Sequence, residues 1–272
     1  GAPLVAGHAL GPAIADVSSS NSLFLCCTTD KRVFAIRDEQ PDVLEHVPFP
    51  PGARVRSVRC AEHHCVALSD RGEVFTWGDC SYGRLGLAED DSSSKPPQPQ
   101  EVQALGGTGE MQLDGTFNGI KLVDCGLWHS VAVSHVDDVF VWGWNNDGQL
   151  GSQLWRRQQY QQQHADDEDN DGDGPQVGKV VGTPQRLSAL DPLLSDGEQI
   201  VQVTCGATFT ALQTSCSKLL VFGRLGLPSS RANCSILRGV DIWPQIADCF
   251  PGKRLSDLMV TAGRWHLCVA DL

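Results

Sequence analysis

The stretch IKLVDCGLWHSVAVSHVDDVFVWGWNNDGQLG, residues 120–151, decides the fold, because weaker copies of it recur along the chain. It contains three short apolar runs that are rich in β-branched and aromatic residues, separated by glycine, aspartate and asparagine. This pattern predicts three short strands joined by tight turns. Three strands alone leave an unpaired edge and a bare apolar face, so the unit needs neighbours.

Copies of the unit are found at fixed offsets. Residues 55–86, which lie 65 positions earlier, place Cys60 opposite Cys125 and His64 opposite His129. Residues 200–226, which lie 80 positions later, keep the cysteine but carry Phe209 in place of the histidine. A degenerate copy covers residues 14–37. A repeat of this length predicts an array or ring of similar small sheets.

The two ends of the chain match different parts of the unit. Residues 258–269 match its first two strands, and residues 3–11 match its third strand and closing turn. One unit split between the termini would close a ring and remove the exposed sheet edges. We therefore predict an all-β fold, a single five-bladed β-propeller over residues 1–272 whose closing blade is shared between the N- and C-termini. Flexible insertions are predicted at residues 88–97 and 158–174.

The repeat carries a family resemblance. The pattern V-x-C-G-x-W-H-S-x-A-V, followed by V-F-x-W-G and G-Q-L-G, resembles the repeat of the regulator of chromosome condensation family. The resemblance covers most of the chain outside the insertions and implies a β-propeller. The first copy departs from it by lacking the glycines and the tryptophan, and the fourth lacks the histidine.

The same resemblance implies two classes of function. The long polar insert after Trp144 is similar to that of a small family member that partners a JmjC-type oxygenase. This similarity implies a non-enzymatic scaffold or adaptor in a chromatin-linked complex, present in nucleus and cytoplasm. The alternative is a guanine nucleotide exchange factor for a small GTPase, the activity of the founding member. That member has a seven-bladed ring and a basic tail, neither of which this sequence shows. A histone or a small GTPase is the alternative partner.

The net charge of −12 bears on the partners. Six acidic residues lie within residues 166–173, where they predict a solvated loop. A calcium loop is disfavoured because Gly178 stands where a bidentate glutamate is required. The acidic balance argues against direct binding of nucleic acid. The short basic group that includes Arg54, Arg56 and Arg59 is predicted to be ordinary solvated surface.

Cysteine usage and hydropathy bear on the compartment. Eleven cysteines are an odd number, and three of them share one repeat position, which favours reduced, packed thiols and a nuclear or cytosolic protein. No segment approaches the roughly 18 apolar residues that a membrane span requires. We therefore expect no membrane partner.

Catalytic patterns are weak. His64, His129 and His266 occupy one repeat position on different blades, so we predict structural histidines bonded to blade backbone and not a zinc site. The chain has no G-x-S-x-G elbow, no phosphate-binding glycine loop and no H-E-x-x-H helix. Asp124 and the Asp137-Asp138 pair are interpreted as turn residues. We expect no enzyme activity, no cofactor and no metal.

One surface remains as a candidate site. The turn between the first two strands places positions 63, 128, 208 and 265 on one rim of the propeller. The candidate partner-binding residues on this rim are His63, Trp128, Arg264, Trp265 and Trp144. Aromatic residues on a rigid rim are good anchors for a protein partner. The alternative is that Trp128 and Trp265 only seal the rim against neighbouring blades.

Overall fold

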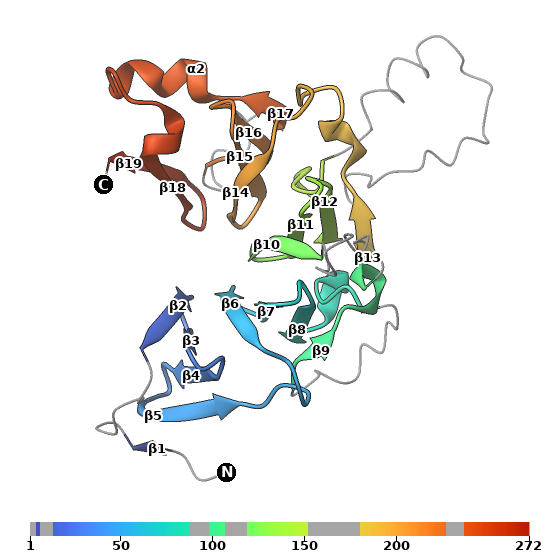
Figure 1. The fold of residues 1–272 in the computed structure, drawn as a ribbon, viewed down its shortest axis with the longest axis vertical. Helices are drawn as coiled ribbons and strands as arrows, with labels where there is room; N and C mark the ends of the chain where they lie inside the picture. The colour runs from blue at the N-terminus through green and yellow to red at the C-terminus, as the bar shows by residue number, and fades with distance from the viewer. Residues whose placement is uncertain are drawn as a thin grey trace, which may run out of the picture.

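A computed structural model of the chain describes residues 4–5, 13–87, 98–106, 119–151, 180–226 and 237–271. These residues form five antiparallel sheets arranged around an open arc, with the first strand of each repeat nearest the common centre (Figure 1). The predicted insertions at 88–97 and 158–174, including the segment considered as a calcium loop, lie outside the described residues.

The three middle sheets have four strands each, in chain order from the centre outwards. They are formed by β6 (Val55–Cys60), β7 (His64–Ser69), β8 (Val74–Gly78) and β9 (Gln100–Glu101); by β10 (Ile120–Cys125), β11 (His129–Ser134), β12 (Val139–Trp144) and β13 (Val180–Arg186); and by β14 (Ile200–Cys205), β15 (Phe209–Thr214), β16 (Leu219–Gly223) and β17 (Leu237–Asp241).

The first sheet shows that the degenerate copy folds like the others. It contains β2 (Ile14–Ser19), β3 (Leu23–Thr28), β4 (Val33–Arg37) and β5 (Gln40–Val47). Leu25, Val33 and Ala35 are buried in a core shared with the next sheet. The sheet therefore forms without the glycine and tryptophan of the repeat, because its apolar side chains still fill the space between blades.

The prediction of a closing blade shared between the termini is wrong for the described residues. The last sheet contains only β18 (Leu258–Ala262) and β19 (Leu267–Asp271), whereas β1 (Leu4–Val5) pairs with β5 of the first sheet. The labels of β1 and β19 lie well apart in Figure 1. The five sheets make an open arc that does not bring β1 to β19 (Figure 1). The rest of residues 3–11 lies outside the described residues.

Packing between sheets explains the burial pattern. All six residues of β7, of β11 and of β15 are buried, because the second strand of each sheet is covered on both faces by its neighbours. The largest core cluster runs through the three middle sheets and includes Val131, Trp142 and Phe222. A chain of β-branched and aromatic side chains thus joins the sheets into one body.

Tight turns bring each hairpin to the rim. Gly143, which pairs with His129, has φ of 110°, and a Cβ there would lie 2.5 Å from the carbonyl oxygen of Trp128. That space is needed because the same carbonyl accepts a hydrogen bond from the N–H of Trp144 at 2.9 Å. Glycine is required here because larger residues fit neither the dihedral angle nor the gap.

Short helical segments lie outside the sheets. They are α2 (Trp243–Ile246) and the 3₁₀ turns η1 (Ser81–Gly83), η2 (Gln103–Leu105), η3 (Ser188–Leu190), η5 (Ala247–Cys249) and η6 (Leu255–Asp257). In the described part of the chain no helix is long and apolar enough to cross a membrane.

Candidate partner-binding rim

The rim residues of the second and third sheets form an aromatic cluster. Trp128 stands nearly perpendicular to Trp144 and to Tyr82, with ring centroids 5.4 and 5.5 Å apart. Tyr82 and Trp144 stack at 4.6 Å with 10° between their planes, and His63 lies 5.6 Å from Trp128. Edge-to-face and stacked contacts at these distances are favourable, so the four rings form one self-packed group.

The rim residues of the last sheet join this cluster through an ion pair. The guanidinium of Arg264 lies over the ring of Trp265 at 5.4 Å and within 3.1 Å of Glu62 Oε2. Glu62 precedes His63 in the chain, so the two groups are connected across the centre of the arc. We call this set the rim strip, and its members are Glu62, His63, Tyr82, Arg84, Trp128, Trp144, Arg264 and Trp265.

All five residues predicted for the rim therefore lie in one connected strip. The fourth rim position, Thr208, is buried, and its hydroxyl donates to the carbonyl of Arg224 at 2.8 Å. The aromatic part of the strip is thus confined to the second, third and last sheets.

Arg84 is the residue that sequence reasoning missed. Its side chain is 1% exposed beneath the cluster, with the guanidinium carbon 4.9 Å from the Trp128 ring centroid and 5.6 Å from that of Tyr82. Burial lowers the pKa of the guanidinium. A signal was present in the sequence, because Arg84 stands where the next copy has Gln149. The change from the uncharged Gln149 to a cation at this position was the available signal, although Arg224 precedes the closing Leu-Gly of the fourth copy in the same way.

Two of the three repeat histidines, His64 and His129, join neighbouring sheets through side-chain hydrogen bonds, whereas His266 is exposed. His64 Nε2 lies 2.8 Å from Ser130 Oγ, and His129 Nε2 lies 2.9 Å from Thr210 Oγ1. The predicted bond from histidine to blade backbone is therefore replaced by one to a hydroxyl of the next sheet. Each hydroxyl donates in turn to a carbonyl, that of Arg84 at 2.9 Å or that of Gln149 at 2.8 Å.

This arrangement fixes the state of both rings. Because each hydroxyl gives its hydrogen to a carbonyl, it accepts from the histidine, which must carry its proton on Nε2. Burial lowers the pKa of His129 to about 3 and the pKa of His64 well below its usual value. Both rings are neutral at physiological pH. They hold neighbouring sheets together through their Nε2 atoms.

The inner strands surround a polar central hollow of about 570 Å³. Three side chains at one repeat position accept a backbone N–H from the next sheet: Ser18 from Cys60 at 3.0 Å, Asp124 from Cys205 at 2.7 Å and Thr204 from Ala262 at 3.0 Å. These bonds join the sheets at the centre as the histidines do further out.

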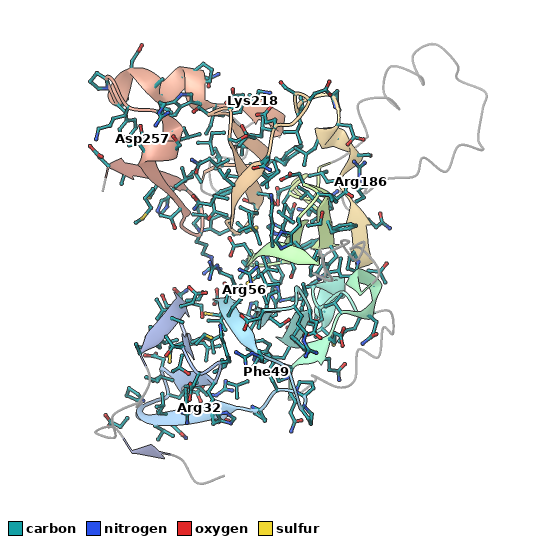
Figure 2. The ribbon with its side chains drawn as sticks, viewed as in Figure 1. Arg32, Phe49, Arg56, Arg186, Lys218 and Asp257 are labelled. Carbon is teal, nitrogen blue, oxygen red and sulfur yellow. The ribbon has the colours of Figure 1, made fainter. Side chains whose placement is uncertain are left out.

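Arg59 occupies the same position in the second sheet and cannot accept a hydrogen bond. It donates to Asp16 Oδ2 at 2.7 Å, and its Nε lies 3.8 Å from Asp124 Oδ1. Two interpretations from the sequence are thus corrected: Asp124 lies on β10 and not in a turn, and Arg59 lines the hollow instead of open surface. Arg56, labelled in Figure 2, also lines it and donates to the carbonyl of Lys121 at 2.8 Å. Asp137, by contrast, is a turn residue with φ of 67°.

Burial dominates the electrostatics of the hollow. It raises the pKa of Asp124 to about 6, although Arg59 and two backbone N–H groups act in the opposite direction. Among the described residues, no group of three or more histidine, cysteine, aspartate or glutamate side chains is placed to hold a metal ion.

Comparisons with known proteins agree with this architecture. A profile of the regulator of chromosome condensation (RCC1) repeat matches residues 71–133 and 137–213, which is just over half of the chain. Human RCC1 domain-containing protein 1 is 28% identical over 234 residues, covering 82% of this chain and 57% of that protein. The chain thus spans little more than half the length of this curated relative.

Solved structures support the fold alone, because their sequence identity is low. The crystal structure of human WBSCR16 superposes with a TM-score of 0.65 at 16% identity, covering 97% of this chain and 59% of that one. Prp20p from Saccharomyces cerevisiae gives a TM-score of 0.64 at 16% identity, covering 95% and 56%. With the repeat, the stacked sheets and the profile match in agreement, the chain belongs to the regulator of chromosome condensation (RCC1) repeat family.

Proposed function

We propose that this chain is a non-enzymatic β-propeller scaffold that binds a partner protein on its rim strip. The observation that carries the proposal is the connected strip itself, which gathers three tryptophans, a tyrosine and two arginines on one rim. Tryptophan, tyrosine and arginine supply most of the binding energy in protein interfaces.

The exposure of the strip favours binding over simple sealing of the blades. The three tryptophans of the strip are half-buried, whereas the repeat tryptophan of the core, Trp142, is fully buried. Tyr82 is 43% exposed, and His63 and Arg264 are also exposed. A residue that only sealed the contact between blades would be covered as Trp142 is. His63, Trp128 and Trp265 lie on hairpin turns between paired strands, so these residues lose little order when a partner docks.

A JmjC-type oxygenase in a chromatin-linked complex, in nucleus and cytoplasm, is our proposed partner. This choice of partner rests on the similarity of the insert after Trp144 to the insert of a family member that binds a JmjC-type oxygenase. For the second class, an exchange factor, the support is that Prp20p, which shares the fold, binds Gsp1p and histones. A shared fold alone does not transfer an activity.

Variants of the strip test the proposal by co-purification with candidate JmjC oxygenases. Trp128→Ala and Trp144→Ala should each weaken retention of the partner at least tenfold, because they remove central aromatic anchors. Val136→Ala is a matched control, since Val136 is 62% exposed but lies at the opposite end of β11. Retention that is unchanged in the tryptophan variants would disprove the role of the strip.

Two further measurements separate the alternatives. Thermal unfolding of the same variants distinguishes an anchor from a seal, because a seal predicts a large fall in Tm together with the loss of binding. Release of labelled nucleotide from small GTPases tests the exchange-factor class. Stimulated release that depends on the chain would overturn the scaffold proposal.

A further inference from the structure

We propose that the rim strip recognises an acidic segment of its partner, with one carboxylate of that segment pairing with the guanidinium of Arg84. This inference rests on the proposed function and adds the chemistry of the ligand.

The guanidinium of Arg84 is only partly satisfied within the described structure. Its Nε donates to the carbonyl of Ser81 at 2.7 Å, and Nη2 lies 3.9 Å from Asp79 Oδ2, too far for a hydrogen bond. Its Nη1 is buried without a hydrogen-bond partner in the described part of the chain. A buried charge that lacks hydrogen-bonded partners is costly, and a carboxylate placed against it recovers that cost.

The aromatic neighbours leave this need unmet. The rings of Trp128 and Tyr82 attract the cation through their faces, but they accept no strong hydrogen bond. The same contacts argue against a basic ligand. A second cation would compete with Arg84 for the face of Trp128, and Tyr82 and Trp144 already cover one another by stacking.

Tyr82 is the group that can move to admit a carboxylate. Its φ is 60°, a left-handed conformation that is strained for a tyrosine, and η1 has no buried residues of its own. Its side chain is 43% exposed, unlike that of Arg84 beneath it. Displacing Tyr82 would uncover the guanidinium at smaller cost than moving either tryptophan.

The other end of the strip has the same chemistry. Arg264 pairs with Glu62, and the two side chains are 45% and 32% exposed. An exposed pair of this kind is worth little, so an incoming carboxylate can replace Glu62. Each guanidinium group of the strip has one carboxylate nearby, Asp79 at 3.9 Å from Arg84 and Glu62 at 3.1 Å from Arg264, but the first distance is too long for a hydrogen bond and the second pair is exposed. Both groups can therefore take a carboxylate from an acidic segment that spans the two ends of the strip.

Selection from a display library of random 12-residue peptides on the full chain tests the ligand class. Peptides enriched through the rim should carry aspartate or glutamate next to an apolar residue. Changing the acidic residue of such a peptide to its amide should weaken binding about tenfold or more, because a charge-assisted hydrogen bond is lost.

Arg84→Gln is the decisive variant. Glutamine is the repeat's own residue at this position in the next sheet, where Gln149 stands, so the variant should fold. It should lose the preference for the acidic peptide over its amide. Arg186→Gln is the matched control, because Arg186 is about half exposed and pairs with Asp138 and Asp191 away from the rim. It should keep the preference.

The outcomes separate this inference from the function on which it rests. Enriched peptides that are basic or neutral, yet still lost in Trp128→Ala, would overturn the acidic ligand and keep the rim as a binding site. Enrichment that is absent, or unaffected by Trp128→Ala, would overturn both. An acidic preference that survives in Arg84→Gln would overturn the role of Arg84.

Discussion

Two neighbouring contacts between sheets use the same repeat position in opposite ways. Between the third and fourth sheets, His129 meets the hydroxyl of Thr210. Between the fourth and last sheets, Phe209 stands in the histidine position and packs in an apolar cluster that includes Leu267, which occupies the hydroxyl position. The two partners change together, polar with polar and apolar with apolar. The fourth copy therefore replaces the polar histidine–hydroxyl pair by an apolar pair, Phe209 and Leu267.

The apolar and the polar contact contribute to the stability of the sheet interface in different ways. The apolar pair gains stability from burial and has no required orientation. The polar pair adds a directional bond that fixes which atom of the ring faces the neighbouring sheet, but it leaves Nδ1 of His129 buried without a partner in the described residues. It also makes the contact sensitive to acid, because a buried imidazole must remain neutral.

Removing the histidine should have the largest effect. His129→Ala deletes a fully buried ring and leaves a cavity between two sheets, so we expect a loss of about 3 kcal/mol in the free energy of unfolding. Urea unfolding at pH 7.5 measures it. His266→Ala serves as the control, because His266 has the same repeat position but is exposed, and it should change stability by less than about 0.5 kcal/mol. Equal effects at the two positions would contradict the structural role of His129.

Lowering the pH should give the next largest effect. The pKa of His129 is about 3 in the folded protein and about 6.5 when unfolded, so the unfolded state binds more protons between these values. The stability that depends on the neutral ring is complete above about pH 6.5 and is lost as the pH falls towards 3. At pH 5 the expected loss is about 2 kcal/mol for this residue, with His64 acting in the same direction.

Asp124 should oppose part of that loss. Its folded pKa of about 6 lies above the unfolded value, so its contribution is present at low pH and is lost as the pH rises through about 6. Urea midpoints between pH 4.5 and 7.5 should still rise with pH, because the histidines dominate. A midpoint that falls across this range would contradict the assignment of neutral buried histidines.

Exchanging one type of contact for the other should have an intermediate effect. His129→Phe and Thr210→Leu should each destabilise alone, whereas the double variant should recover about 1 to 2 kcal/mol of the summed losses. Recovery will be incomplete, because the carbonyl of Gln149 loses its donor. A double-mutant cycle by urea unfolding measures the coupling. Strictly additive losses would show that the two positions are not coupled. In the double variant the free energy of unfolding should also fall less at low pH, because the buried imidazole is gone.

The smallest effect is expected at the rim, just beyond the apolar contact. Arg264→Ala removes an exposed ion pair with Glu62 and should cost at most about 1 kcal/mol. The difference from the unmodified chain should narrow in 0.5 M salt, because exposed charges are screened. A loss as large as that of His129→Ala would mean that the rim strip is structural.

The repeat was readable from the sequence because its signals are local. Glycine at Gly143, the buried Trp142 and the apolar runs each determine a turn or a strand within about 30 residues, and the predicted strands agree with β10, β11 and β12. The rim positions could likewise be aligned by offset. Their connection through Glu62 and Arg264 could not, because it joins sheets that are not neighbours in the chain.

The pairing of the N-terminal strand and the positions of the buried arginines were harder to predict from the sequence. The proposed pairing of residues 3–11 with the last sheet relied on similarity and spacing, but strand pairing depends on which edge lies within reach, and β5 offers the nearer one to β1. Arg59 looked like exposed surface because the two arginines of Val55–Cys60 give no sign in the sequence that this strand faces a central hollow. The hidden position of Arg84 depends on Trp128, 44 residues further along.

The paired side chains also constrain how the chain can be rearranged. The third sheet presents the hydroxyl of Ser130 to the sheet before it and His129 to the sheet after it. Duplicating or removing such a sheet would leave every histidine opposite a hydroxyl. Excising the fourth sheet would instead set His129 against Leu267, a polar group against an apolar one. Insertion and deletion are therefore tolerated at some borders and penalised at others.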